Sequence, residues 1–131
     1  MFLDKWIVSP LFRERPDVGC RIEEYDMNSW QPFAGTGTIK LKDAKYVLLR
    51  TTFEPERSQQ EKGGNILLQQ VVGKAEVWLN NRKIGSKTTE QNRDLEIEFP
   101  PVKGECDLRV LLIGVDNTTV GIKGCIRIRS K

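Results

Sequence analysis

The sequence predicts an all-β protein folded as a single β-sandwich. Segments in which apolar and polar residues alternate recur from one end of the chain to the other, a period typical of half-buried strands. Turn-forming residues separate these segments at intervals of about 8 to 12 residues, which is the spacing expected of a sandwich or barrel. The length of 131 residues suits one domain. Residues 1–131 are therefore predicted to form one unit.

The first half of the chain holds three predicted strands and one long irregular segment. A strand is expected over residues 5–10, and residues 11–37 are rich in charged residues, proline and glycine, which indicates a loop. The apolar runs AKYVLLRTTF and NILLQQVV predict strands over residues 44–53 and 65–72. Proline and glycine residues between these two strands supply the turn chemistry.

The segment GKAEVWLNNRKIGSKT predicts a β-hairpin with strands over residues 75–79 and 82–87. Asn80 and Asn81 tolerate positive φ better than most residues, so they suit the two central positions of a type I′ turn. Because side chains alternate across a strand, one face is predicted to point into the core and the other to be solvated. The core face would hold Ala75, Val77 and Leu79, and the solvated face Glu76 and Trp78.

Three more strands are predicted in the last third of the chain, over residues 94–99, 106–114 and 124–129. The first of them, DLEIEF, alternates strictly, which indicates a strand with one buried face. Prolines, glycines and the segment DNTT provide turns between the strands. The predicted inward residues of DLEIEF are Leu95, Ile97 and Phe99, and the outward ones are Glu96 and Glu98.

Composition excludes several classes of function. Lys+Arg 21 and Asp+Glu 18 are interspersed and leave a net charge of +3, which gives no reason to expect a nucleic-acid partner. No apolar run approaches the ~20 residues of a membrane span, and the start lacks a signal-peptide pattern, which leaves the native compartment open. The absence of histidine excludes Ser-His-Asp and Cys-His catalysis within this chain. Cys20, Cys106 and Cys125 allow at most one disulfide and are expected to be small core residues.

Several segments, in the right order, resemble one protein family. The hairpin GKAEVWLNNRKIGSKT, the later segments LEIEFPP, LRVLLIG and GIKGCIRI, and the earlier YDMNSWQPF and LLRTTFEP are similar to galactose-binding-like jelly-roll domains of family-two glycoside hydrolases. The similarity is greatest to bacterial β-galactosidases. Asn81 departs from the pattern, because the family usually has glycine there. The resemblance implies a jelly-roll sandwich that is a fragment of a larger glycoside hydrolase.

The resemblance also implies that this chain is not an enzyme by itself. The hydrolytic glutamates of such enzymes lie in a (β/α)₈ barrel of about 250 residues, for which this chain is too short. The carboxylates of EEYD show no spacing that would aim two of them at one sugar. The resemblance therefore implies an accessory domain of a β-galactosidase, with the catalytic domain as partner and galactosides as possible ligands. Related enzymes are often exported, so a periplasmic or secreted parent is expected.

If the domain binds carbohydrate, one candidate site lies in the segment DMNSWQ. An aromatic ring stacks on the apolar face of a pyranose, while carboxylate and amide groups bind its hydroxyls. The alternative is that the tryptophan anchors the long loop on the sandwich and that Asn28 or Ser29 caps a short turn. The candidate carbohydrate-binding residues are Asp26, Asn28, Trp30 and Gln31.

A second candidate site is the face that carries Glu76 and Trp78. Aromatic residues are enriched in protein interfaces, so a contact with another domain is favoured over a sugar platform. Trp6 is expected in the core. Arg50 lies in an otherwise apolar strand and is predicted to pair with a carboxylate such as Asp26.

No cofactor and no metal site are expected. The segment VDNTT offers calcium too few oxygen ligands, because calcium takes about 6 to 8, so a plain turn is favoured. Two alternatives to the accessory domain stay open. One is a self-standing lectin-like galactoside-binding module, and the other is a purely structural assembly domain.

Overall fold

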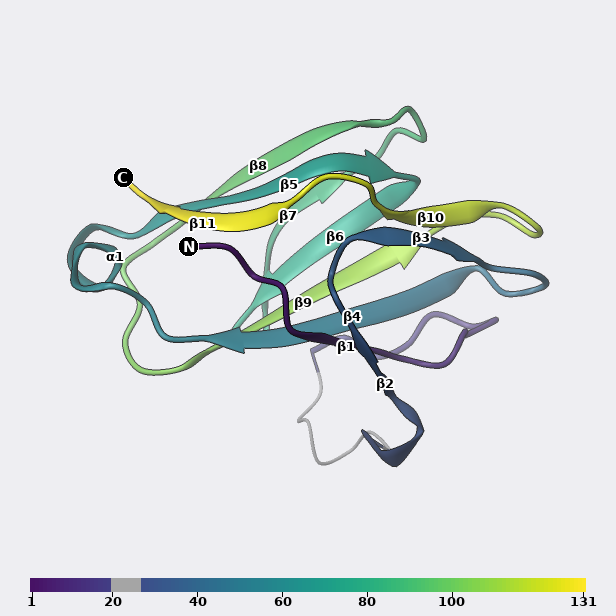
Figure 1. Cartoon of the computed structure of the whole chain (residues 1–131), viewed down its shortest axis with the longest axis horizontal. Helices are drawn as coiled ribbons and strands as arrows, with labels where there is room; N and C mark the ends of the chain where they lie inside the picture. The colour runs from purple at the N-terminus through teal and green to yellow at the C-terminus, as the bar shows by residue number, and fades with distance from the viewer. Residues whose placement is uncertain (20–26) are drawn as a thin grey trace.

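The computed structural model describes residues 1–19 and 27–131, and in them two antiparallel sheets pack face to face (Figure 1). This is the all-β sandwich predicted from the alternating sequence pattern. The two sheets enclose one main core, to which strands of both contribute. Figure 1 shows the two ends of the chain side by side at one end of the molecule.

The first sheet has six strands in the order β2-β1-β4-β9-β6-β7. Its centre is formed by two long strands that pair along their whole length, β4 and β9. The edge strand β2 contains a proline, which an edge strand tolerates because one side of its backbone needs no partner. The strands are β1 Trp6–Val8, β2 Gln31–Phe33, β4 Tyr46–Phe53, β6 Lys74–Leu79, β7 Arg82–Lys87 and β9 Cys106–Ile113.

The second sheet has five strands arranged around its longest member, β5. Along one edge β5 pairs with β8, and along the other it pairs first with β11 and then with β10, which in turn pairs with β3. A bulge lies between Leu68 and Val71, where Gln70 has a φ of 55°. The strands are β3 Gly37–Lys40, β5 Gly64–Val72, β8 Arg93–Phe99, β10 Thr119–Ile122 and β11 Ile126–Ser130.

Two short helical elements were not predicted. The 3-10 helix η2 spans Met27–Ser29, and α1 spans Arg57–Lys62. The first turn of α1 is fixed by the buried side chain of Gln59, whose Oε1 accepts a hydrogen bond from the backbone N–H of Glu56 at 2.9 Å. No helix in residues 1–19 and 27–131 is long and apolar enough to cross a membrane.

The predicted hairpin is present in β6 and β7. Asn80 and Asn81 have φ angles of 50° and 66°, so both adopt the left-handed conformation that a type I′ turn requires. Ala75, Val77 and Leu79 point into the core as predicted. The register shifts between Val77 and Trp78, so the pairing is less regular than simple alternation implies.

The N-terminal segment links the two sheets. Met1 and Leu3 lie beside β11, where the N–H of Leu3 donates to the carbonyl of Ile126 at 2.9 Å and the N–H of Ile128 donates to that of Met1 at 2.8 Å. The chain then crosses to the first sheet and enters β1. At the crossing, Trp6 is 3% exposed and its Nε1–H donates to the carbonyl of Leu3 at 3.0 Å, which confirms its predicted place in the core.

The cysteines are partly as predicted. Cys106 is buried in the main core and Cys125 is half-buried, and both are free thiols. Burial raises the pKa of the Cys106 thiol. Cys20 lies outside the described residues.

Candidate functional site

The outer face of the six-stranded sheet is covered, in contrast to the solvated face predicted for it. Residues 11–19, called the strap below, cross this face and pair with β4 where the N–H of Phe12 donates to the carbonyl of Tyr46 at 2.8 Å. A second apolar cluster lies between the strap and the sheet, and the strap contributes Phe12 and Val18 to it. Its buried members are Val18, Trp30, Leu48 and Leu111, and Ile7, Phe12, Tyr46, Trp78 and Ile113 pack against them.

Glu76 fastens the strap to the sheet. The Arg15 guanidinium donates to both oxygens of the Glu76 carboxylate, at 2.8 and 2.5 Å. The indole Nε1–H of Trp78 donates to the same carboxylate at 3.2 Å, and the Lys83 ammonium lies 3.8 Å from it. The hydrogen bonds from Arg15 hold the pKa of Glu76 below its usual value and raise the pKa of Arg15.

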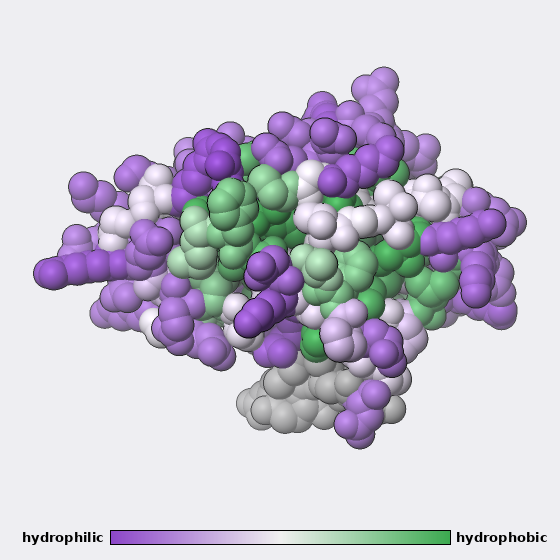
Figure 2. All heavy atoms as spheres, in the orientation of Figure 1, coloured by the Kyte–Doolittle hydropathy of each residue, from purple (hydrophilic) through white to green (hydrophobic). Residues whose placement is uncertain are grey.

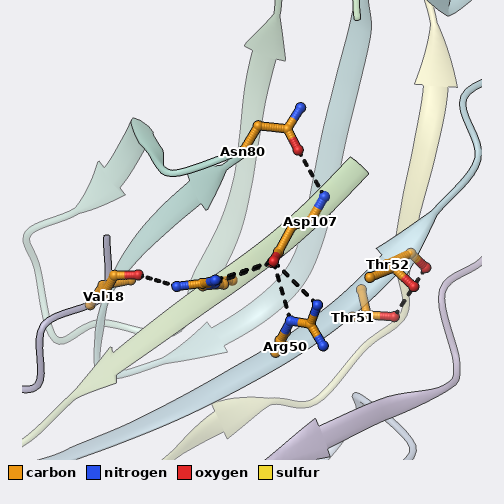
Figure 3. Close-up of polar contacts among 7 residues, drawn as sticks. Val18, Arg50, Thr51, Thr52, Asn80 and Asp107 are labelled. Carbon is orange, nitrogen blue, oxygen red and sulfur yellow. Dashed lines mark hydrogen bonds and ion pairs between the residues drawn. The ribbon is translucent and has the colours of Figure 1, made fainter. Parts of the chain in front are cut away.

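A second polar group lies beside this one on the same face. The Asp107 carboxylate accepts hydrogen bonds from Nε and Nη2 of Arg50, both at 3.3 Å, and from Nε and Nη2 of Arg109, both at 3.2 Å (Figure 3). Arg109 is 2% exposed, and its Nη1 also donates to the carbonyl of Val18 in the strap at 2.6 Å. The backbone N–H of Asp107 donates to Oδ1 of Asn80, at 2.8 Å, which connects the group to the hairpin turn.

The prediction that Arg50 pairs with a carboxylate is confirmed, with Asp107 as a partner. The sequence suggested Asp26 for this role, and Asp26 lies outside the described residues. Arg50 and Arg109 stand opposite each other in the register of β4 and β9. Two guanidinium groups sharing one carboxylate fit a partly buried site, because each charge keeps a hydrogen-bonded partner.

The predicted carbohydrate-binding residues that the structure describes differ in their exposure to solvent. Asn28 in η2 and Gln31 at the start of β2 are exposed. Trp30, between them, is 7% exposed and belongs to the second apolar cluster, so its ring faces are covered by protein. This placement matches the alternative in which Trp30 anchors the long loop. A role of Asn28, Trp30 and Gln31 in sugar binding stays a prediction.

The predicted interdomain residues Glu76 and Trp78 lie beneath the strap. Glu76 is 9% exposed and Trp78 is half-buried. The strap backbone is close to the indole, because a Cβ added at Gly19 would lie 3.3 Å from Cζ3 of Trp78. A docking role for this face stays a prediction, and it requires a contact that reaches past the strap.

The described residues contain no group of three or more His, Cys, Asp or Glu side chains placed to hold a metal ion. The segment considered for calcium forms a turn that is also hydrogen-bonded to Lys42. Oγ1 of Thr118 donates to the carbonyl of Val115 at 2.6 Å, and the N–H of Asn117 donates to the carbonyl of Lys42 at 2.5 Å.

No family model matches the chain, and a search of curated proteins finds no match. Solved structures do match. A β-glucuronidase from Bacteroides uniformis superposes with a TM-score of 0.77 and 12% identity, over 98% of this chain and 17% of that chain. A glycosyl hydrolase family 2 member from Bacteroides cellulosilyticus superposes with a TM-score of 0.73 and 15% identity, over 98% of this chain and 20% of that chain. A β-D-mannosidase from Dictyoglomus thermophilum superposes with a TM-score of 0.70 and 14% identity, over 99% of this chain and 22% of that chain.

The chain has the fold of a part of family-two glycosidases. The match extends over nearly all of this chain, which confirms the resemblance in fold indicated by the sequence motifs. The chain spans about a fifth of the length of these family-two structures. The identities of 12 to 15% are evidence of shared fold alone.

Proposed function

We propose that the chain is a non-catalytic β-sandwich domain of a longer family-two glycosidase and that it packs on the catalytic domain of the same polypeptide. The observation that carries this proposal is the match in length. Nearly the whole chain superposes on a fifth of each enzyme, as an accessory domain would. The motifs spread along the sequence support the same assignment independently.

The absence of histidine and the small size support a non-catalytic role. A barrel that holds two catalytic carboxylates takes about 250 residues, whereas this chain has 131 residues and the strands in its described parts form one sandwich. The charged groups on the sheet face hold the strap in place. Their hydrogen bonds go to other groups of the protein, as a structural role requires.

The identity of the parent enzyme is a finer proposal. The sequence motifs favour a β-galactosidase, with galactosides as ligands that the domain helps to place. The superposed structures include a β-glucuronidase and a β-D-mannosidase, so the parent is to be assayed with aryl β-galactosides, β-glucuronides and β-mannosides. A self-standing lectin-like module and a purely structural assembly domain are the alternatives.

The size of the natural polypeptide tests the proposal. Antibodies raised against the 131-residue chain should detect, in the source cells, a polypeptide about five times as long, as the superposed structures suggest. That polypeptide should hydrolyse an aryl glycoside, and the isolated chain should not. Detection of a polypeptide of only this length, or turnover by the pure chain, would contradict the proposal.

A further inference from the structure

A row of four residues crosses the strands on the outer face of the second sheet. Phe2 forms an isolated bridge with Arg127 of β11, and Arg127 stands opposite Leu67 of β5. Leu67 in turn stands opposite Glu96 of β8. Residues that stand opposite each other in antiparallel strands share a face. Because the residues on either side of Arg127 belong to the main core, the four side chains lie on the outer face.

A second row lies two residues further along the same strands. Arg129 of β11 stands opposite Asn65 of β5, and Asn65 stands opposite Glu98 of β8. The outer face therefore has a positive stripe on β11, formed by Arg127 and Arg129, and a negative stripe on β8, formed by Glu96 and Glu98. β5 separates the two stripes, so their backbones lie two strand spacings apart, about 10 Å.

Most of these charges have no ion pair within the chain. Among the residues that the structure describes, only Glu98 of the four has an ion-pair partner, the ammonium of Lys131 at 3.6 Å. Both glutamates and Arg129 are exposed, and Arg127 is half-buried. The two stripes can therefore form ion pairs with a partner that lies on this face.

An exposed aromatic ring lies at the border of the positive stripe. The guanidinium carbon of Arg127 is 5.9 Å from the centre of the Phe2 ring, and Phe2 is 64% exposed. Figure 2 shows apolar atoms near the N-terminus marked in Figure 1, and mostly hydrophilic atoms along the upper margin, where β8 lies. The contact with the ring favours one orientation of Arg127, because a guanidinium group is attracted to an aromatic face.

The arrangement of the two stripes is self-complementary. Two positive and two negative groups leave the face without net charge, so it favours neither a polyanion nor a polycation. β5 lies between the stripes, so a two-fold axis parallel to β5 in the plane of contact exchanges the positions of β11 and β8. Two copies that stack about this axis place the positive stripe of each over the negative stripe of the other, as a symmetric interface requires.

We propose that the outer face of the second sheet binds a second copy of this chain. Arg127 of each copy pairs with Glu96 of the other, and Arg129 pairs with Glu98, which gives two kinds of ion pair, each present twice. Phe2 lies at the rim of the contact. This inference goes beyond the proposed function, because it concerns two copies of the domain and not its contact with a catalytic domain.

The test is sedimentation equilibrium of the 131-residue chain over a range of protein concentrations. At about 0.05 M salt, monomer and dimer should be in equilibrium with a Kd of about 100 μM, because the interface is small and polar. Raising the salt to about 0.5 M should weaken the dimer at least about tenfold, since the ion pairs are accessible to counterions.

Charge-reversal variants test which residues meet. Arg127→Glu and Glu96→Arg each place like charges opposite each other at two symmetric positions, so each should weaken the dimer at least about tenfold. An equimolar mixture of the two variants should regain about the natural affinity, because every reversed charge then faces an opposite one. Arg129→Glu changes an exposed residue and tests the second row without altering the Phe2 contact.

The matched control is Arg82→Glu, which makes the same charge change at an exposed residue of β7 in the other sheet. It should change the Kd by less than about twofold. Three results would overturn the proposal: a chain that stays monomeric at about ten times the expected Kd at low salt, a dimer that Arg127→Glu and Arg82→Glu weaken equally, or a mixture that associates no better than either variant alone. The proposed function fails on the length of the natural polypeptide instead, so the two failures are distinguishable.

Discussion

Glu76 and Arg15 form a two-point ion pair, in which both carboxylate oxygens accept hydrogen bonds from the guanidinium, at 2.8 and 2.5 Å. The two residues are 61 positions apart in the sequence. The side chain of Glu76 is 11% exposed and that of Arg15 is 45% exposed. The pair therefore ties the otherwise irregular strap to the middle of β6.

Removing the charge of Glu76 should loosen the strap. Glu76→Gln is expected to lower the free energy of unfolding by about 1 kcal/mol, because the pair is charge-assisted but its Arg15 side is open to solvent. Urea denaturation measures this change. Trypsin cleavage after Arg13 should also become faster. Arg57→Gln breaks an exposed pair with Glu61 and serves as the control, with a change below about 0.5 kcal/mol.

The contribution of the Arg15–Glu76 pair to stability should decrease at acid pH. The pKa of Glu76 is lowered in the folded state, chiefly by the hydrogen bonds from Arg15. A group whose pKa is lower in the folded state stabilises the fold when the pH is above its pKa in the unfolded chain. This stabilisation is lost as the pH falls through its pKa in the folded protein. The difference in unfolding free energy between the natural chain and Glu76→Gln should shrink below about pH 4.5. A difference that stays constant down to pH 2 would contradict this assignment.

Replacing the two asparagines of the hairpin turn should have different effects on stability. Asn81→Gly keeps the positive φ at lower steric cost and should leave stability unchanged or slightly higher. Asn80→Gly also relaxes φ, but it removes the Oδ1 acceptor of the Asp107 N–H and should lower the unfolding free energy by about 0.5 to 1.5 kcal/mol. Thermal denaturation of the two variants measures the difference. Equal effects would show that the Asn80 side chain adds nothing.

The second apolar cluster should be as sensitive as the main core. Leu48 is fully buried on the face that the strap covers, so Leu48→Ala should lower the unfolding free energy by about 2 to 5 kcal/mol. Val115 is 52% exposed, and Val115→Ala should change the free energy of unfolding by less than about 0.5 kcal/mol. Urea denaturation of both variants is the measurement. If Leu48→Ala costs as little as Val115→Ala, the strap does not seal this face in solution.

The long strands and the hairpin could be predicted because their alternation is regular. The elements β2, β3 and β10 were missed because each has only three or four residues and includes proline or glycine. The covered outer face was also missed, although a signal exists. The continuous apolar residues at 47–49 and 110–112 are typical of strands buried on both faces.

The residues that fasten the strap could not be found from sequence pattern. Arg15 lies in a stretch without periodicity, and its partner is a glutamate that alternation assigns to solvent. Lys87 is a similar case, because a lysine at a strand end is expected at the surface. It is 1% exposed, and its ammonium donates to the carbonyls of Gly73 and Thr89 at 2.6 and 2.7 Å. Such placements depend on which segments meet in three dimensions.

The contact between the first residues and β11 sets an order of events during synthesis. Met1 and Ile128 are 127 positions apart, and hydrogen bonds join their backbones in both directions. The hairpin of β6 and β7 has short loops and can form while the chain is still on the ribosome. The sandwich cannot close until the last strand has left the exit tunnel, since pairings of such long sequence separation form slowly and late. Until then the edge that awaits β11 is open to nascent-chain chaperones and to mispairing with other strands.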